Sequence, residues 1–276
     1  MDISLKTGIE TYFAYMFGGM LRKMSCKLRP YEKEKGSTDK VLKRSVSVFY
    51  DAFIGKKPLE KAVVEVVEDF KSIETEKTSR PKIALFGDLY VRDNDIMNQN
   101  LIKFIENAGG EVITISLSDF AKMITNSYVK RWFWDGRFKD AIASKGAMLM
   151  AGTIENIYYK HFNEILQEKE AVNPIDLKFI MDKFHVMPEH SGESMDNLIT
   201  IFSLLEQYPD ISLFVQLSPA FCCAGLITEA MSSSIESITG VPIVSLTYDG
   251  TGKNQNDKLI PYIKYPKKRS GHLSRV

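Results

Sequence analysis

Two adjacent cysteines, Cys222 and Cys223, are the residues of this 276-residue chain whose type and position most favour chemistry. They follow a short apolar run, residues 211–217, and directly precede residues 224–239, which have the length of a helix and end at Gly240. Main-chain N–H groups at the positive end of a helix favour a thiolate over a neutral thiol. Thiolates ligate zinc and iron–sulfur clusters. The pair is therefore a candidate metal site, with a redox group and plain packing as the alternatives.

A second polar turn, formed by Asp249, Gly250 and Thr251, follows another apolar run, residues 242–247. Two apolar runs joined by a helix predict a right-handed crossover between parallel strands. The carboxyl ends of parallel strands meet at one edge of the sheet, where open α/β sheets bind ligands. We therefore expect both turns at that edge. Asp249 either holds a ligand or a neighbouring main chain there, or forms a plain Asx turn.

An earlier crossover precedes this unit in the chain. Residues 82–88 and 111–116 have the apolar pattern of buried strands, and residues 95–108 between them have that of a helix. Asp88 then occupies the same kind of turn as the cysteine pair. If the strand order is flavodoxin-like, 2-1-3-4, the first and third strands are neighbours. The switch point of the sheet would lie between Asp88 and Cys222, and it is the expected ligand crevice.

The rest of the chain has helical periodicity. Residues 1–78 predict an N-terminal helical segment, and residues 79–276 predict a Rossmann-like α/β domain with a four-stranded parallel sheet. Within that domain, residues 119–208 are expected to form a helical insertion. Gly192 and Glu193 precede one helix of the insertion. They either line the crevice or form a loop and a helix cap.

Composition excludes several classes of function. A net charge of +1 and a pI of about 7.6 give no indication of a nucleic-acid or membrane partner. The first apolar segment is far shorter than the roughly 20 residues that span a bilayer, and no signal sequence is expected. Three cysteines are too few for a secreted disulfide framework. We therefore expect a cytoplasmic protein.

The number of available protein ligands limits the kind of metal site that the cysteine pair can form alone. A zinc or iron–sulfur site generally takes four protein ligands, and adjacent residues seldom ligate one ion together. Cys26 is the only other thiol, no CxxC motif is present, and the four histidines lack metal-ligand spacing. Any cluster therefore needs ligands from another subunit or another part of the protein. The sequence shows no nucleophile with a base, so it leaves open whether the chain is an enzyme, and it leaves the oligomeric state open, a homo-oligomer included.

Several segments together resemble one known family, the acyl-CoA dehydratase activase-related proteins. The resemblance is to their C-terminal region and runs from about residue 10 to residue 265. The most specific segments are SPAFCCAGLITEAM and TGVPIVSLTYDGTG, within residues 218–252. Weaker ones are KIALFGDLYVRDND (82–95), NAGGEV (107–112), Gly192-Glu193, and Arg29-Pro30-Tyr31-Glu32 with Gly36, Thr38 and Asp39. The chain is also similar to cluster-bearing subunits of 2-hydroxyacyl-CoA dehydratases and to double-cubane cluster proteins.

This resemblance implies a cytoplasmic iron–sulfur protein of an anaerobe, which receives single electrons from an ATP-driven activator. Cys222 or Cys223 matches the family's cluster cysteine, and Asp249, Gly250 and Thr251 match the turn that follows. The family's other cysteines lie in an N-terminal α/β domain that has no counterpart here. The implied partner is therefore an ATP-dependent activase or a cysteine-bearing α/β domain that completes a [4Fe-4S] cluster. The alternative is a binding module whose crevice docks a small ligand or a partner protein without metal.

Overall fold

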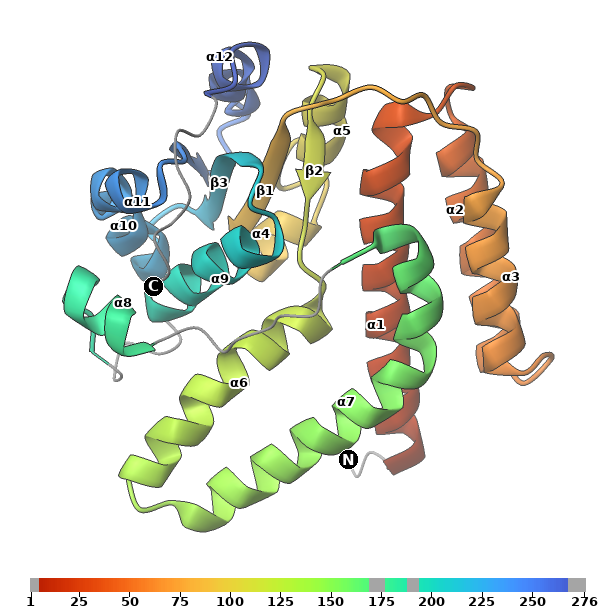
Figure 1. Cartoon of the computed structure of the whole chain (residues 1–276), viewed down its shortest axis with the longest axis horizontal. Coiled ribbons are helices and arrows are strands. Elements are labelled where there is room, and N and C mark those ends of the chain that lie inside the picture. The colour runs from red at the N-terminus through yellow and green to blue at the C-terminus, as the bar shows by residue number, and fades with distance from the viewer. Residues whose placement is uncertain (1–4, 169–176, 188–193, 268–276) are drawn as a thin grey trace.

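A four-stranded parallel sheet forms the centre of the protein (Figure 1). The computed structural model describes residues 5–168, 177–187 and 194–267. The strands lie in the order β2-β1-β3-β4, and their bounds are Lys82–Gly87 (β1), Glu111–Ile113 (β2), Ile211–Pro219 (β3) and Ile243–Tyr248 (β4). The predicted α/β class, the all-parallel sheet and the flavodoxin-like order are confirmed.

The two central strands are apolar because both faces of the sheet are covered. Ile83, Leu85, Leu213 and Leu217 face one layer, with α4, α5 and α12 packed on it. Alternate residues face the other layer, which α8, α9 and α11 cover. A parallel strand buried on both faces needs a continuous apolar run, and this is the pattern that identified the strands in the sequence.

The helices are numerous and of very unequal length. The N-terminal ones are α1 (Leu5–Leu28), η1 (Arg29–Tyr31), α2 (Ser37–Phe53) and α3 (Leu59–Lys71). Those following β1 and β2 are α4 (Leu89–Asp93), α5 (Leu101–Asn107), α6 (Leu117–Trp134), α7 (Phe138–Leu166), α8 (Leu177–Phe184) and α9 (Ser194–Gln207). Those following β3 and β4 are α10 (Cys223–Ala230), α11 (Ser232–Thr239), η3 (Asn256–Leu259) and α12 (Ile260–Lys264).

Three predicted elements have different bounds in the structure. The helix expected at residues 95–108 begins only at Leu101, because the Asn94 side chain accepts the N–H groups of Ile96 and Met97 and holds a turn. Strand β2 ends at Ile113, short of the expected Ser116, whose hydroxyl caps α6. The helix expected at residues 224–239 is two helices that meet at Met231.

The N-terminal helices share a second hydrophobic core with the C-terminal half of α7. Phe17 of α1 lies 5.8 Å from Phe162 of α7, between ring centres, and 4.8 Å from Phe49 of α2. Ile165 and Leu166 of α7 belong to the same core. The predicted N-terminal segment and the predicted insertion therefore pack on each other. The division of the chain into residues 1–78 and 79–276 stays a prediction.

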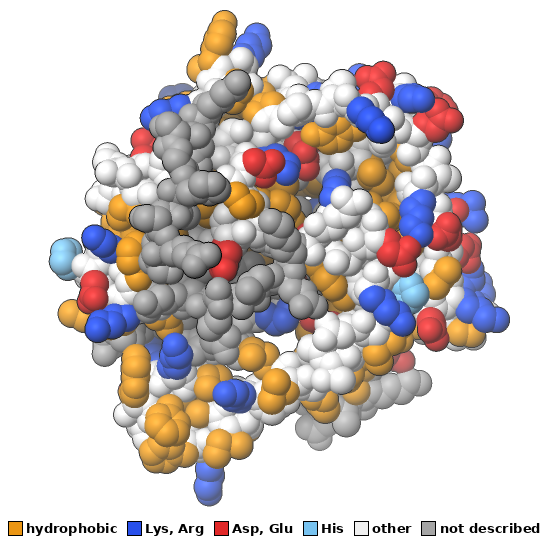
Figure 2. Space-filling model, viewed as in Figure 1, with side chains coloured by type: hydrophobic (Ala, Val, Ile, Leu, Met, Phe, Trp, Pro, Cys, Tyr) orange, Lys and Arg blue, Asp and Glu red, His pale blue; other side chains and the backbone are white. Residues whose placement is uncertain are grey.

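The α6–α7 hairpin ends in an exposed apolar tip. Phe133 and Trp134 of α6 are 60% and 63% exposed, and Phe138 at the start of α7 is 51% exposed. Hydrophobic side chains gather over this end of the molecule in Figure 2. Among the described residues, no helix combines the length and the hydrophobicity that a membrane-spanning segment requires.

The shared helical core gives a stability prediction. Phe162 is fully buried, so we expect Phe162→Ala to lower the free energy of unfolding by about 3 to 5 kcal/mol, through lost burial and a cavity. Urea denaturation at neutral pH measures the loss. Phe133→Ala is the matched control, because that ring is mostly exposed. Similar losses for the two variants would contradict the assignment of this core.

Candidate functional site

The turn after β1 is built around Gly87 and Asp88. Gly87 has φ +109°, and a Cβ there would lie 2.3 Å from the Leu217 carbonyl oxygen, so the position requires glycine. The Asp88 N–H donates to that same oxygen at 2.8 Å. The Asp88 carboxylate accepts the Val91 N–H, also at 2.8 Å, and caps α4. Asp88 thus joins β1 to β3 at the carboxyl edge through its main chain, and its side chain has a local structural role.

The turn after β3 carries the two cysteines. Cys222 is the N-cap residue of α10 and makes no side-chain capping hydrogen bond, and Cys223 is the first residue of that helix. Both thiols are free; Cys222 is half-buried and Cys223 is exposed. Phe221, directly before them, has φ +64° and is 94% exposed. A non-glycine residue in this backbone region is strained, and an exposed aromatic ring there gains no burial in return.

Polar contacts under α10 fix the start of the helix on the sheet. The buried Gln216 of β3 donates from Nε2 to the Gly225 carbonyl oxygen at 2.7 Å. A Cβ on Gly225 would lie 2.8 Å from the Ser218 Cβ, so α10 approaches the strand more closely than an alanine would allow. Asn197 of α9 donates to Thr228 Oγ1 at 2.9 Å on the other side. These contacts hold the start of α10, and with it the two cysteines, at the carboxyl edge of the sheet.

The turn after β4 is an Asx turn. The Asp249 carboxylate accepts from the Thr251 N–H at 2.9 Å and from the Thr251 hydroxyl at 2.7 Å. These hydrogen bonds hold the pKa of Asp249 below its ordinary value. Gly250 has φ +77°, which glycine adopts readily. These hydrogen bonds form the Asx turn, and a ligand role of Asp249 stays a prediction.

The three turns lie along one edge of the sheet, because β1 pairs with β3 and β3 pairs with β4. The Ala220 N–H, just before the cysteines, donates to the Tyr248 carbonyl oxygen at 3.1 Å, next to Asp249. In the described residues, no hydrogen bond or ion pair joins the side chains of Asp88, Cys222 and Asp249. Gly192 and Glu193, the other candidate crevice residues, lie outside the described residues.

The metal-ligand set is incomplete in the described part of the chain. No group of three or more His, Cys, Asp or Glu side chains there could hold a metal ion. Cys26, the third thiol, is buried in the core beneath α5, and burial raises its pKa to about 12. A thiol with that pKa is neutral and packs as a small apolar group. The carboxyl edge therefore supplies two adjacent thiols, whereas a [4Fe-4S] cluster generally takes four ligands.

Comparison with protein-family models, with curated proteins and with solved structures gives no match to this chain. The resemblance to the dehydratase activase-related proteins therefore stays a prediction.

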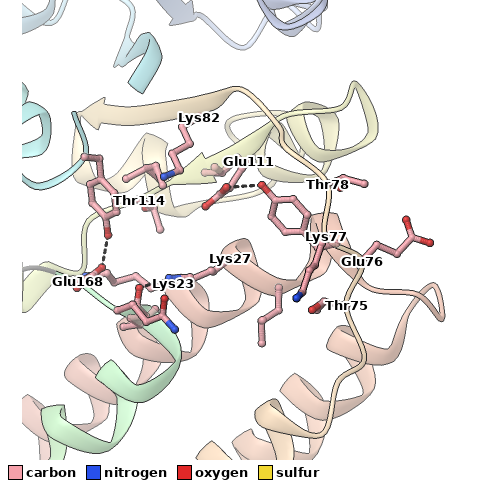
Figure 3. Close-up of a pocket in the computed structure, with 17 residues that line it drawn as sticks. Lys23, Lys27, Thr75, Glu76, Lys77, Thr78, Lys82, Glu111, Thr114 and Glu168 are labelled. Carbon is pink, nitrogen blue, oxygen red and sulfur yellow. Dashed lines mark hydrogen bonds and ion pairs between the residues drawn. The ribbon is translucent and has the colours of Figure 1, made fainter. Parts of the chain in front are cut away.

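A cavity of about 520 Å³, not predicted from the sequence, lies at the opposite end of the strands. It lies where α1 and α7 end, beside the segment of residues 72–81 and the edge strand β2 (Figure 3). Lys23 and Lys27 of α1 reach it, and their spacing of four residues places them on one face of the helix. Neighbouring Met20 and Met24 are fully buried. Two lysines beside a buried apolar stripe are the signal that could have indicated this cavity.

A buried ionic network closes one side of the cavity. The Lys23 ammonium lies 2.9 Å from the Asp119 carboxylate and 2.7 Å from the Glu168 carboxylate. Tyr208 also donates to Glu168, at 2.5 Å. Burial alone would raise the pKa of Asp119, but Lys23 and Lys122 hold it at about 2. The network links α1, α6 and the end of α7.

The exposure of the three thiols predicts the order in which they react. We expect native protein to be alkylated by iodoacetamide fastest at Cys223 and more slowly at half-buried Cys222. Cys26 should react only after denaturation, because it is buried and neutral. Peptide mass spectrometry over a time course measures the three rates. Rapid labelling of Cys26, or inert Cys223, would contradict the described arrangement.

Asp119 gives a prediction for acid stability. The pKa of Asp119 is lower in the folded protein than in the unfolded chain. Its contribution to the free energy of unfolding is therefore fully present above the unfolded pKa of about 3.9, and it is lost as the pH falls through about 2. Asp119→Asn should cost about 2 kcal/mol of unfolding free energy at neutral pH, and the difference from wild type should shrink between pH 4 and pH 2. Urea titrations across this range measure both. The exposed Asp182→Asn is the control, and a pH-independent difference for Asp119→Asn would refute the assignment.

Proposed function

We propose that this protein is a cytoplasmic accessory component of a 2-hydroxyacyl-CoA dehydratase/activase system that transfers electrons through an iron–sulfur cluster. In this proposal the turn with Cys222 and Cys223 supplies thiolate to a [4Fe-4S] cluster that a partner completes. The observation that carries the proposal is the exposed Cys223 thiol at the first residue of α10, on the carboxyl edge of the sheet. Exposure leaves the thiol accessible to a cluster shared with another chain.

The surroundings of Cys223 support a shared site. Leu226 and Ile227 lie three and four residues further along α10, on the same face of the helix as Cys223. They are 56% and 41% exposed, and Phe221 beside them is almost fully exposed. A partner that covered these side chains would bury apolar surface and exclude water from the thiols. Low-potential iron–sulfur chemistry benefits from such shielding.

The partner in this proposal is the ATP-dependent activase or a cysteine-bearing α/β domain, which brings the remaining ligands. Cys223 is the ligand on this side, since it is the more exposed thiol. Cys222, the N-cap residue, is only half-buried and makes no side-chain capping hydrogen bond. A bound cluster would supply one-electron transfer; the role of this chain's residues is to hold a thiolate at a fixed point on a rigid sheet edge.

A metal-free binding module is the second candidate. The observation that favours it is the engagement of Asp88 and Asp249 in their own turns, together with the incomplete ligand set in the described residues. The exposed side chains Phe221, Leu226 and Ile227 would contact a partner equally well without metal. In that case the edge docks a protein and the thiols have no ligand role.

Anaerobic incubation with ferrous and ferric iron in equal amounts, sulfide and excess 2-mercaptoethanol tests the first candidate, because the small thiol can stand in for ligands of the missing partner. We expect wild type and Cys26→Ala to keep iron and sulfide in stoichiometric amounts after desalting, with iron–sulfur absorbance. Cys223→Ser should lose most of both, through loss of a thiolate ligand. Iron and sulfide analysis of the desalted protein measures the effect.

Two outcomes would contradict the iron–sulfur proposal. One is equal retention of iron by wild type and by the double variant Cys222→Ala/Cys223→Ala, since the bound iron would then not involve these thiols. The other is the absence of iron from wild type while its exposed thiol remains reactive. The second outcome would favour the metal-free module.

A further inference from the structure

We infer that the tip of the α6–α7 hairpin binds to the surface of a membrane that contains anionic lipids. The tip comprises residues 130–145, which form the end of α6, the turn and the start of α7. Neither helix carries a cysteine. The inference therefore does not depend on the proposed iron–sulfur function.

The hairpin projects from the rest of the molecule, and main-chain hydrogen bonds close its turn. Figure 1 shows the turn between α6 and α7 at the end of the hairpin that lies away from the sheet. The Asp135 N–H donates to the Arg131 carbonyl oxygen at 2.9 Å. The Arg137 N–H donates to the Trp132 carbonyl oxygen at 2.8 Å. The side chains on both sides of the turn are therefore presented together.

Aromatic and aliphatic side chains of the tip are exposed to solvent. The ring centres of Phe133 and Phe138 lie 5.0 Å apart, yet each of these side chains is more than half exposed. Trp134 beside them is also mostly exposed. Ile142 is 73% exposed, and it lies four residues after Phe138, on the same face of α7. Exposed apolar side chains that gather in one place mark an interaction surface.

The same tip has an excess of positive charge. Residues 130–145 contain two acidic residues, Asp135 and Asp140, and five basic ones, Lys130, Arg131, Arg137, Lys139 and Lys145. The tip therefore has a net charge of +3, whereas the whole chain has +1 and the remainder of the chain is net negative. Figure 2 shows basic side chains among the hydrophobic ones at this end of the molecule. The near-zero charge of the whole chain, which gave no indication of a membrane partner, conceals this local excess.

Three of the basic side chains are available to an external partner. Both carboxylates of the tip are paired with arginines, one with Arg131 at 3.8 Å and the other with Arg137 at 2.8 Å. Lys130, Lys139 and Lys145 are exposed, and none of them forms an ion pair with a residue that the structure describes. Their ammonium groups can therefore contact negative charge outside the protein.

An anionic lipid surface matches both properties of the tip. Aromatic side chains favour the level of the lipid headgroups, where their apolar parts leave water. Lysine side chains extend along the same region and keep their ammonium groups beside the phosphates and carboxylates of the lipids. Each basic residue close to an anionic bilayer strengthens binding roughly fivefold.

A second copy of the chain and an acidic protein match the tip less well. Two tips in contact would place one net charge of +3 against another, and like charges repel. A protein that enclosed the aromatic side chains would need a concave site shaped for a projecting tip. Lipid headgroups, by contrast, can rearrange around it. The tip therefore fits a lipid surface best.

Vesicle binding by the full chain tests the inference. We expect vesicles of phosphatidylcholine with phosphatidylserine to be bound at least about tenfold more tightly than vesicles of phosphatidylcholine alone, at roughly 0.1 M salt. Co-sedimentation measures the affinity. Both tryptophans of the chain, Trp132 and Trp134, lie in the tip, so the tryptophan emission reports on the tip alone. Binding should shift this emission to shorter wavelengths, because the exposed indole of Trp134 leaves water.

Charge-reversal variants locate the contact. Lys139→Glu/Lys145→Glu should weaken binding to the phosphatidylserine vesicles at least about tenfold. Lys43→Glu/Lys61→Glu is the matched control, because it has the same net charge and changes lysines of α2 and α3, far from the tip (Figure 1). This control should bind within about twofold of wild type, since salt screens distant charges. All four lysines are exposed, so neither variant should disturb folding.

An apolar variant separates insertion from charge. Phe138→Ser/Ile142→Ser keeps the charge of the tip and removes exposed apolar surface. It should weaken vesicle binding several-fold and reduce the emission shift, because less apolar surface enters the headgroup region. Cys223→Ser should bind vesicles like wild type, which separates this inference from the iron–sulfur proposal.

Four outcomes would overturn the inference. Absent binding to both kinds of vesicle would exclude a lipid surface and leave an acidic protein as the occupant. Binding without an emission shift would show that the tip does not enter the headgroup region. An equal loss of binding in Lys43→Glu/Lys61→Glu would show that total charge decides, whatever its position. A dimer in analytical ultracentrifugation, with the emission shift present in the absence of lipid, would assign the tip to a second copy.

Discussion

The direct pairing of β1 with β3 is the constraint on which the rest of the structure depends. It places the turn at Asp88 beside the strand that leads to the cysteines, through the main-chain bond from Asp88 to Leu217. Gly87 permits this approach because any side chain there would overlap the Leu217 carbonyl. With β4 added on the far side, three turns from distant parts of the chain lie along one edge. That edge is the usual ligand edge of an open α/β sheet.

A second constraint ties the helical layer to the sheet. Lys23 is buried with the Glu168 carboxylate after α7, and it also pairs with the half-buried Asp119 at the start of α6. An unpaired charge at this depth would be costly, so the three groups must be brought together or not at all. The network therefore fixes where α1 crosses the two long helices. It also fixes the shape of the cavity that these helix ends enclose.

The sheet could be predicted from the sequence because its two central strands are buried on both faces and their residues are therefore mostly apolar. The flavodoxin-like order was one arrangement compatible with two crossovers, which the sequence does not fix and the structure confirms. The errors arose where side chains bond the main chain: Asn94 delays the start of α5, and Ser116 ends the extended segment after β2 by capping α6. The same kind of contact engages Asp249 in a local turn, since its partner Thr251 is only two residues away.

The cavity could not be predicted because the residues that line it come from five separate parts of the chain and form no local motif. Lys77 belongs to a polar stretch that looks like an ordinary linker, and Thr114 is one of many threonines. Only the packing of α1 against β2 brings them together. The sequence placed the two thiols at a turn, but it left plain packing open, and only the structure shows that Cys223 is exposed.

The separation of β1 from β3 in the chain also affects how the protein folds. Residues 88–210 lie between these two strands, and closing a loop of that length costs roughly 4 kcal/mol of chain entropy before the strands gain any contact. During synthesis, β1 can pair with β2 early. Its neighbour on the other side, β3, becomes available only after most of the chain has left the ribosome. An open apolar strand edge in a nascent chain is a site for chaperones and for misassembly. Helices α2 and α3 pack on each other and can form during this delay, whereas α1 also packs on β2, α6 and α7, which are made later.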